Sequence, residues 1–229
     1  MTGRIFLYLF CAANVCLTAC AQRNSEGKHY KEMVDSFAAM APITSSDIVM
    51  LGDSHTECGG DWNQYFPRVR NIQNRGIIGD DSRDILKRLS QVCSCNPKAI
   101  FFECGANDLS YGYTAERVAL DVLMVVDSIR AACPATLLYV QSVFPLNEDF
   151  GRWKKLEGRT NDVPVINKLL KQGCEQRGIE YIDLFAKFKE PRSNKMRKEI
   201  SRDGLHLKPS GYKIWAETIA PYIKKINSK

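Results

Sequence analysis

The chain has 229 residues, of which 45% are apolar and 25% are charged. A chain of this length can bury one sizeable core, and its composition excludes both wholesale disorder and a polytopic membrane protein. The net charge of +6 comes from 32 basic and 26 acidic side chains that are spread along the sequence, so no nucleic-acid partner is expected.

The amino terminus has the pattern of an export signal. Arg4 is followed by an apolar run over residues 5–17, which is too short to span a bilayer. The run ends in Leu-Thr-Ala-Cys, which resembles the lipobox of bacterial lipoproteins, and this resemblance implies that Cys20 is lipidated and begins the mature protein. An uncleaved anchor is the alternative. We expect an exported protein that touches the membrane only through its lipid anchor, in the periplasm or at the cell surface.

The expected divisions of the chain are a signal peptide over 1–19, a lipidated tether over 20–28 and one folded domain over 29–229.

Export affects how the cysteines are interpreted, because disulfides persist outside the cytoplasm. The chain has nine cysteines. Three of them fall in the expected signal and lipid site, and the others are Cys58, Cys93, Cys95, Cys104, Cys133 and Cys174. Their spacing is not that of a zinc site, so no metal is expected.

Past the tether, helical and extended patterns alternate, which predicts an α/β fold with a parallel sheet. Short apolar or β-branched runs predict five strands, at residues 47–51, 71–74, 99–104, 136–141 and 180–184. The clearest helices are predicted at residues 114–133, 162–177 and 209–226.

Two of these helices carry an apolar stripe at helical spacing. In the first, Thr114 is a plausible cap, and its Met and Val side chains, with Val118, Val122, Val125 and Ile129 along one face, are expected in the core. In the last helix, Tyr212, Trp215, Ile219 and Ile223 are expected to serve packing.

Polar motifs follow the strands, where ligands bind in open parallel sheets. The first strand runs into Gly-Asp-Ser-His at 52–55, the second into Arg-Gly-Ile-Ile-Gly-Asp at 75–80 and the third into Gly-Ala-Asn-Asp at 105–108. Asp-Gly-Leu-His at 203–206 precedes the last helix. In this order the four blocks resemble those of the SGNH, or GDSL, hydrolase family. The stretch 74–89 looks most like the branch with platelet-activating-factor acetylhydrolase subunits and carbohydrate acetylesterases.

The resemblance implies a three-layer, flavodoxin-like α/β/α sandwich and a serine hydrolase mechanism. Ser54 would be the nucleophile, His206 its general base and Asp203 the group that orients the imidazole. The oxyanion hole would consist of the Ser54 N–H, the Gly79 N–H and the Asn107 side-chain amide. Among the three histidines, His206 is favoured as base by elimination too, because His29 lies near the tether.

His55, directly after the serine, is the alternative base. A role at the rim of the site or in packing is favoured for it, because adjacent residues on a turn point in different directions. The aspartates Asp53, Asp80 and Asp108 are expected to organise their loops.

The expected function is an esterase that removes small acyl groups, acetyl foremost, from extracellular glycans or related substrates, without a cofactor. The alternatives are a lipase or lysophospholipase, an O-acyltransferase with the same triad, and a catalytically silent binding lipoprotein.

Trp153, which has Arg152, Lys154 and Lys155 around it, could stack on a sugar or face an anionic substrate. A solvated loop with one buried tryptophan is the alternative.

The strand directions also predict where four cysteines lie. Cys93 and Cys95 precede the third strand, Cys133 the fourth and Cys174 the fifth, so all four should lie at the amino ends of the sheet, opposite the catalytic loops. A disulfide from Cys93 or Cys95 to Cys133 is geometrically possible. Free buried thiols are the equal alternative.

Overall fold

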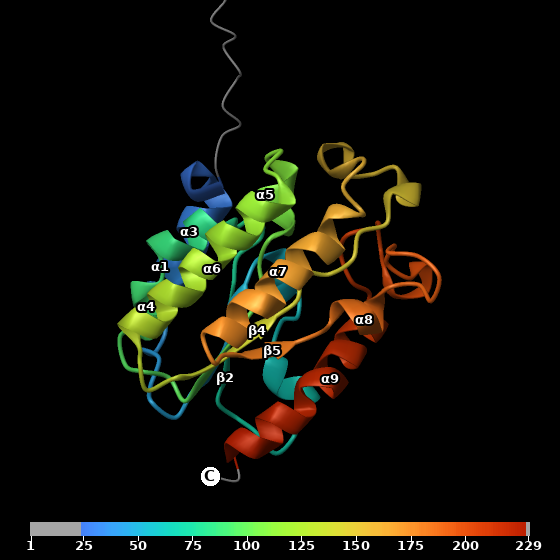
Figure 1. Ribbon diagram of the computed structural model, residues 1–229. Helices are drawn as coiled ribbons and strands as arrows, with labels where there is room; N and C mark the ends of the chain where they lie inside the picture. Colours follow the sequence, from blue (N-terminus) through green and yellow to red (C-terminus); the bar gives the residue numbers. More distant parts are fainter. Residues whose placement is uncertain (1–23, 228–229) are drawn as a thin grey trace, which may run out of the picture.

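The structure, a computed structural model, describes residues 24–227. The predicted signal peptide and Cys20 lie outside the described residues. The five predicted parallel strands are confirmed and pair in the order β2-β1-β3-β4-β5 (Figure 1). Their bounds are β1 Ile48–Gly52, β2 Ile72–Gly76, β3 Ala99–Phe102, β4 Leu137–Gln141 and β5 Glu180–Ile182.

Helices cover both faces of this sheet (Figure 1). The elements α1, α3, α4, α6 and α7 lie on one side and α9 on the other, which gives the three layers that were predicted. The α-helices are α1 Lys28–Ala39, α2 Ser54–Glu57, α3 Ser82–Lys87, α4 Ser90–Cys93, α5 Ala106–Ser110, α6 Ala115–Ala132, α7 Asp162–Gln176, α8 Phe185–Phe188 and α9 Pro209–Asn227. Short 3₁₀ helices are η1 Asn24–Glu26, η2 Trp62–Tyr65, η3 Glu148–Phe150, η4 Lys154–Leu156 and η5 Lys198–Ile200.

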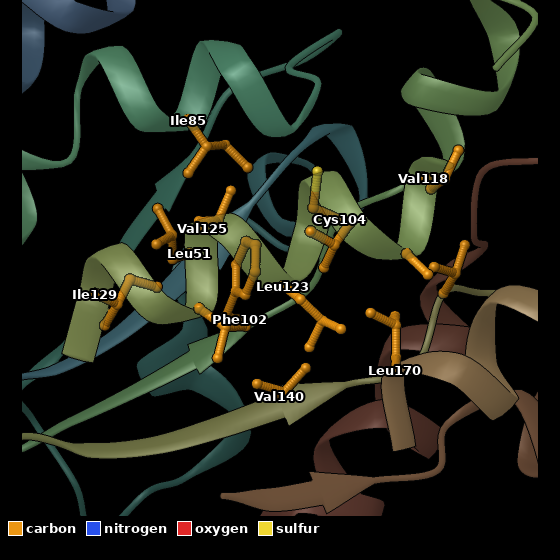
Figure 2. Close-up of a cluster of buried hydrophobic side chains, with 14 of the residues drawn as sticks. Leu51, Ile85, Phe102, Cys104, Val118, Leu123, Val125, Ile129, Val140 and Leu170 are labelled. Atoms are coloured by element: carbon orange, nitrogen blue, oxygen red, sulfur yellow. The ribbon is translucent and has the colours of Figure 1, made fainter. Parts of the chain in front are cut away.

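The larger core lies between the sheet and α6 and α7. The Thr114 hydroxyl caps α6 by accepting from the Arg117 N–H, and the predicted stripe of Val118, Val122, Val125 and Ile129 is buried. Figure 2 shows Val125 and Ile129 on the side of α6 that faces β-strand side chains such as Leu51 and Phe102. The prediction was wrong for Met124, which is 53% exposed on the outer face of α6.

On the other face of the sheet, α9 contributes the predicted aromatic packing. Trp215 is fully buried, meets Trp62 edge to face with ring centroids 4.8 Å apart, and donates from Nε1 to Gln141 Oε1 at 2.7 Å. Tyr212, Ile219 and Ile223 are buried in the same cluster. This packing fixes the last helix, and with it the loop that precedes the helix, against the sheet.

Two strands end earlier than the sequence indicated. After β3 the chain turns at Gly105, whose φ of +137° directs it into α5 instead of further along the sheet. After β5, Leu184 donates to the Ile182 carbonyl, which closes a turn into α8. In both places the chain therefore leaves the sheet at the edge where the polar motifs lie.

The six cysteines in the described part of the chain are free thiols. Cys95 is exposed, whereas Cys93 and Cys133 are buried with their sulfur atoms 3.0 Å apart. The structure therefore agrees with the alternative of free buried thiols for Cys93 and Cys133, whose sulfur atoms lie next to each other. Within residues 24–227, none of the helices is both long and apolar enough to cross a membrane.

Candidate active site

The site begins where β1 ends. Gly52 closes the strand, and a Cβ at this position would overlap Thr56 Oγ1 and lie 2.6 Å from the Glu103 carbonyl oxygen. The turn that follows is capped by Asp53, whose carboxylate accepts from the His55 N–H at 2.9 Å. Ser54 is therefore held as the first residue of α2, at the carboxyl edge of the sheet.

The structure brings Ser54, His206 and Asp203 together into one relay. Ser54 Oγ lies 3.0 Å from His206 Nε2, and His206 Nδ1 lies 2.9 Å from Asp203 Oδ2. The Nδ1–H bond to the carboxylate leaves Nε2 free to accept the serine proton. The geometry is that of a base-activated nucleophile with an oriented base.

The loop over 203–206 holds this carboxylate rigidly. Asp203 Oδ1 accepts from the N–H groups of Leu205 at 3.1 Å and His206 at 2.8 Å. Burial alone would raise the pKa of Asp203, but the hydrogen bonds from the His206 ring and from these N–H groups outweigh it and lower that pKa to about 2. Burial, and next the charge of His55, lower the pKa of His206, although the hydrogen bond with Asp203 opposes them.

The three predicted oxyanion donors lie in the neighbouring loops. Among the described residues, neither the Ser54 N–H nor the Gly79 N–H has a hydrogen-bond partner, although the Ile78 and Asp80 N–H groups beside Gly79 are both bonded. The Asn107 amide donates to the Asp80 carbonyl at 2.9 Å and to Asp53 Oδ2 at 3.3 Å.

Buried aspartates organise these loops, as predicted. Asp80 accepts from Arg88 Nε at 2.7 Å, and Arg88 also donates to the Gly52 carbonyl at 3.1 Å, so the second block is tied to the end of β1. Asp108 accepts from both the N–H and the hydroxyl of Ser82. These bonds fix the loops relative to one another.

One contact was missed by the sequence analysis. Asn24 donates to the Ile78 carbonyl and to Asp80 Oδ1, both at 2.9 Å, and its Oδ1 lies 2.9 Å from where a Cβ on Gly79 would be. Gly79 has a φ of +88°, so two features of this position favour glycine. The middle of the expected tether therefore packs directly against the Gly79 loop. No local signal in the sequence indicates a pairing over more than fifty residues.

His55 lies in the interior and not at the rim. It is 1% exposed, its ring packs on Phe144 with centroids 4.8 Å apart, and its Nε2 bonds the Leu205 carbonyl at 2.9 Å. Packing is thus the better of the two roles predicted for it, and His206 is the histidine that bonds Ser54.

Trp153 flanks the catalytic loop. It is 43% exposed, and its ring meets the His206 ring edge to face with centroids 5.1 Å apart. The alternative of a buried tryptophan is therefore wrong. A pocket beside Trp153 is lined by Asn147, Glu148, Asp149, Arg152 and Gly204, among others.

Comparison with known proteins places the chain in a family. The sequence profile of the GDSL-like lipase/acylhydrolase family matches residues 50–214. A platelet-activating factor acetylhydrolase IB subunit beta homolog from Drosophila melanogaster is 28% identical over 130 residues, which are 55% of this chain and 56% of that protein. The chain thus matches only about half the length of this curated relative.

Solved structures share the fold. A GDSL-like lipase from Bacteroides thetaiotaomicron superposes with a TM-score of 0.74 at 19% identity, covering 86% of this chain and 97% of the other. A variant of a Geobacillus acetyl-xylooligosaccharide esterase gives a TM-score of 0.62 at 17% identity, covering 82% and 96%. The chain belongs to the GDSL-like lipase/acylhydrolase family.

Proposed function

We propose that the enzyme removes small acyl groups, acetyl foremost, from hydroxylated substrates such as glycans, with Ser54 as nucleophile, His206 as base and Asp203 as its orienting acid. The observation that carries the mechanism is the unbroken hydrogen-bonded relay, 3.0 Å from Ser54 Oγ to His206 Nε2 and 2.9 Å from His206 Nδ1 to Asp203.

In this mechanism Ser54 Oγ attacks the acyl carbonyl carbon while its proton passes to His206 Nε2. The protonated His206 then gives that proton to the leaving alcohol, and an acyl-serine remains. Water, deprotonated by the same imidazole, releases the acid and restores the serine. A negative oxygen forms both when the acyl-serine is made and when it is hydrolysed. The Ser54 and Gly79 N–H groups, each of which lacks a partner among the described residues, would donate hydrogen bonds to it. Asn107 would supply the third donor by giving up its 3.3 Å contact with Asp53.

The pH dependence follows from the state of the base. Because burial and the neighbouring His55 lower the pKa of His206, the imidazole stays neutral at lower pH than an ordinary histidine. We expect kcat/KM for a small acetate ester to rise with pH and to reach half its plateau below about pH 6.5. A midpoint clearly above this value would contradict the arrangement of charges around His206.

A hydroxylated leaving group is favoured by the surroundings of Trp153. This side chain is 43% exposed beside His206, and the adjoining pocket has carboxylate, amide and guanidinium groups in its wall. An exposed aromatic face next to polar side chains suits a sugar ring better than an alkyl chain. The fold likeness to the acetyl-xylooligosaccharide esterase points to the same class.

A panel of esters tests the substrate class. Acetylated oligosaccharides, p-nitrophenyl acetate, p-nitrophenyl palmitate and a lysophospholipid would be compared on the wild type and on Trp153→Ala. We expect Trp153→Ala to raise KM for the acetylated sugars about tenfold more than KM for p-nitrophenyl acetate. Both reactions depend on His206, which the ring contacts, but only the sugar would itself contact the ring. A preference for the palmitate or the phospholipid would favour the lipase alternative. Product that accumulates on an added glycan acceptor would favour acyl transfer.

We also propose that the enzyme is exported and anchored through a lipid on Cys20. Asn24 is hydrogen-bonded to the Gly79 loop. Cys20 is only four residues away along the chain, and a stretch of four residues spans at most about 14 Å. Such an anchor would therefore hold the active site close to the membrane surface, where it would meet substrates at that surface. In a bacterial host, Cys20→Ala should abolish incorporation of radiolabelled palmitate. Incorporation that persists in Cys20→Ala would contradict lipidation at Cys20.

A further inference from the structure

A second histidine lies beneath the catalytic residues and has no part in the proposed mechanism. His55 adjoins Ser54 in the chain, and its Nε2 bonds the carbonyl of Leu205, the residue that adjoins His206. One buried ring thus connects the turn that carries the nucleophile to the loop that carries the base and the acid.

The hydrogen atoms on this ring can be assigned from its partners. A carbonyl oxygen only accepts, so His55 Nε2 carries a proton. On the other side, His55 Nδ1 faces two carboxyl groups, with Asp53 Oδ1 at 3.3 Å and Glu103 Oε2 at 3.9 Å. A bare Nδ1 would point its lone pair at the negative Asp53. Both nitrogen atoms therefore face acceptors, which is the arrangement of an imidazolium.

The two carboxyl groups differ in their hydrogen bonds. Asp53 accepts from the His55 N–H and from the Asn107 amide, which stabilises a negative charge. Glu103 is fully buried, and neither of its oxygens has a hydrogen-bond partner among the described residues. Burial, and next the charge of Asp53, raise the pKa of Glu103 well above its usual range. The cluster is therefore one buried ion pair beside one neutral acid.

We propose that His55 is a positioning residue of the catalytic site: a buried imidazolium, balanced by Asp53, that ties the Ser54 turn to the Leu205 carbonyl and keeps His206 neutral. The inference rests on the proposed function, because it assigns His206 as the base. Burial opposes the charge on His55, but the hydrogen bond and charge of Asp53, and next the hydrogen bond with the Leu205 carbonyl, raise its pKa. The ring of His55 lies 5.9 Å from that of His206, close enough for its charge to disfavour a second imidazolium.

The charged and titratable neighbours of both histidines can be named. Around His55 they are Asp53 on its own turn, Glu103 after β3, His206, and Tyr212 of α9, which donates its hydroxyl to the His55 carbonyl at 3.0 Å. Around His206 they are Asp203, His55 and, at longer range, Asp53. Only His55 can contribute a positive charge to this set.

The direct test is the protonation state of His55, which does not depend on catalysis. The chain has three histidines, so ¹⁵N-histidine labelling gives few signals, and His55→Gln and His206→Gln variants assign them. We expect the His55 ring of the wild type to show two imidazolium-type nitrogens up to about pH 8. A neutral His55 at pH 7 would overturn the proposal, even if a fluorophosphonate probe still labels Ser54. If the imidazolium is present but Ser54 is not labelled, the proposed function fails instead.

Kinetics tests the consequence of the charge. His55→Gln retains a donor for the Leu205 carbonyl but loses the charge, so the acid limb of kcat/KM should move up by about one pH unit or more. Glu103→Gln exchanges one neutral group for another and should leave that midpoint in place. A downward shift in Glu103→Gln would mean an ionised Glu103 and would overturn the assignment.

The side chains of Asp53, His55 and Glu103 also have the donor atoms of a cation site. Elemental analysis of the wild type separates the two possibilities, because a metal would occupy the position of the Nδ1 proton. Stoichiometric metal that is lost in His55→Gln would therefore overturn the proposal.

Discussion

Replacing Ser54 by alanine should lower kcat for acetate esters by about four orders of magnitude or more while the protein still folds. The Ser54 hydroxyl is the atom that His206 Nε2 meets at 3.0 Å, and no other hydroxyl in the described chain bonds that nitrogen. His206→Ala should cost about as much, because a serine without its base is a poor nucleophile. Asp203→Asn should cost less, because the nucleophile and its base both remain.

The measurement is kcat together with thermal unfolding, so that loss of chemistry is separated from loss of fold. Ser128→Ala serves as the matched control, because this serine lies on α6 and bonds only its own helix, at the Met124 carbonyl. Near-wild-type turnover in Ser54→Ala would contradict the proposed mechanism. A parallel loss in Ser128→Ala would show that the readout follows stability instead.

The residues of the proposed triad could be singled out from the sequence because their signals are local. Gly-Asp-Ser-His follows an apolar strand directly, and the acid and base of the last block are three residues apart, so each block can be recognised without the fold. The five strands were likewise predictable from short apolar runs, and their bounds differ from the predicted ones by one or two residues at either end. The strands β3 and β5 end two residues earlier than predicted, because the turns at Gly105 and Leu184 follow them, and both turns depend on three-dimensional contacts.

The helix α1 and the Asn24 contact were not predicted, and both lack a local signal. The Gly27 cap of α1 has no side-chain hydrogen bond, and the helix buries only Tyr30 and Phe37. Those two rings pack against Ile77, far away in the sequence. Long-range packing therefore decides the structure here.

His55 and Trp153 show the same limit in the site itself. Each was noted as a candidate with alternatives, because a residue type on a turn or loop does not show the direction of its side chain. The structure buries His55 against Leu205 and Phe144 and exposes Trp153 beside His206. Both outcomes are set by the catalytic loop and by the long connection after β4, which meet only in the folded protein.

The junction of these two segments predicts a second large effect, at Gly204. This residue has a φ of +90°, its carbonyl accepts from the Asn147 N–H at 2.7 Å, and a Cβ would overlap the Asn147 carbonyl oxygen. Asn147 cannot easily move away, because its side chain donates to the Met196 carbonyl at 2.6 Å. Gly204→Ala must therefore displace the loop that carries Asp203 and His206. A shift of about 1 Å at a catalytic group costs about a hundredfold in rate, and we expect at least that loss in kcat/KM.

Gly178→Ala is the control that separates overlap from backbone strain. Gly178 has a φ of +63° in the turn after α7, and a Cβ there would meet nothing within 4 Å. An alanine in this conformation costs about 1–2 kcal/mol of unfolding free energy, with no reason to alter the kinetics of the folded enzyme. Both variants would be measured for unfolding and for kcat/KM with p-nitrophenyl acetate. If Gly204→Ala loses only the stability that Gly178→Ala loses and keeps its activity, the loop tolerates displacement, and the fixed position of His206 is not what sets the rate.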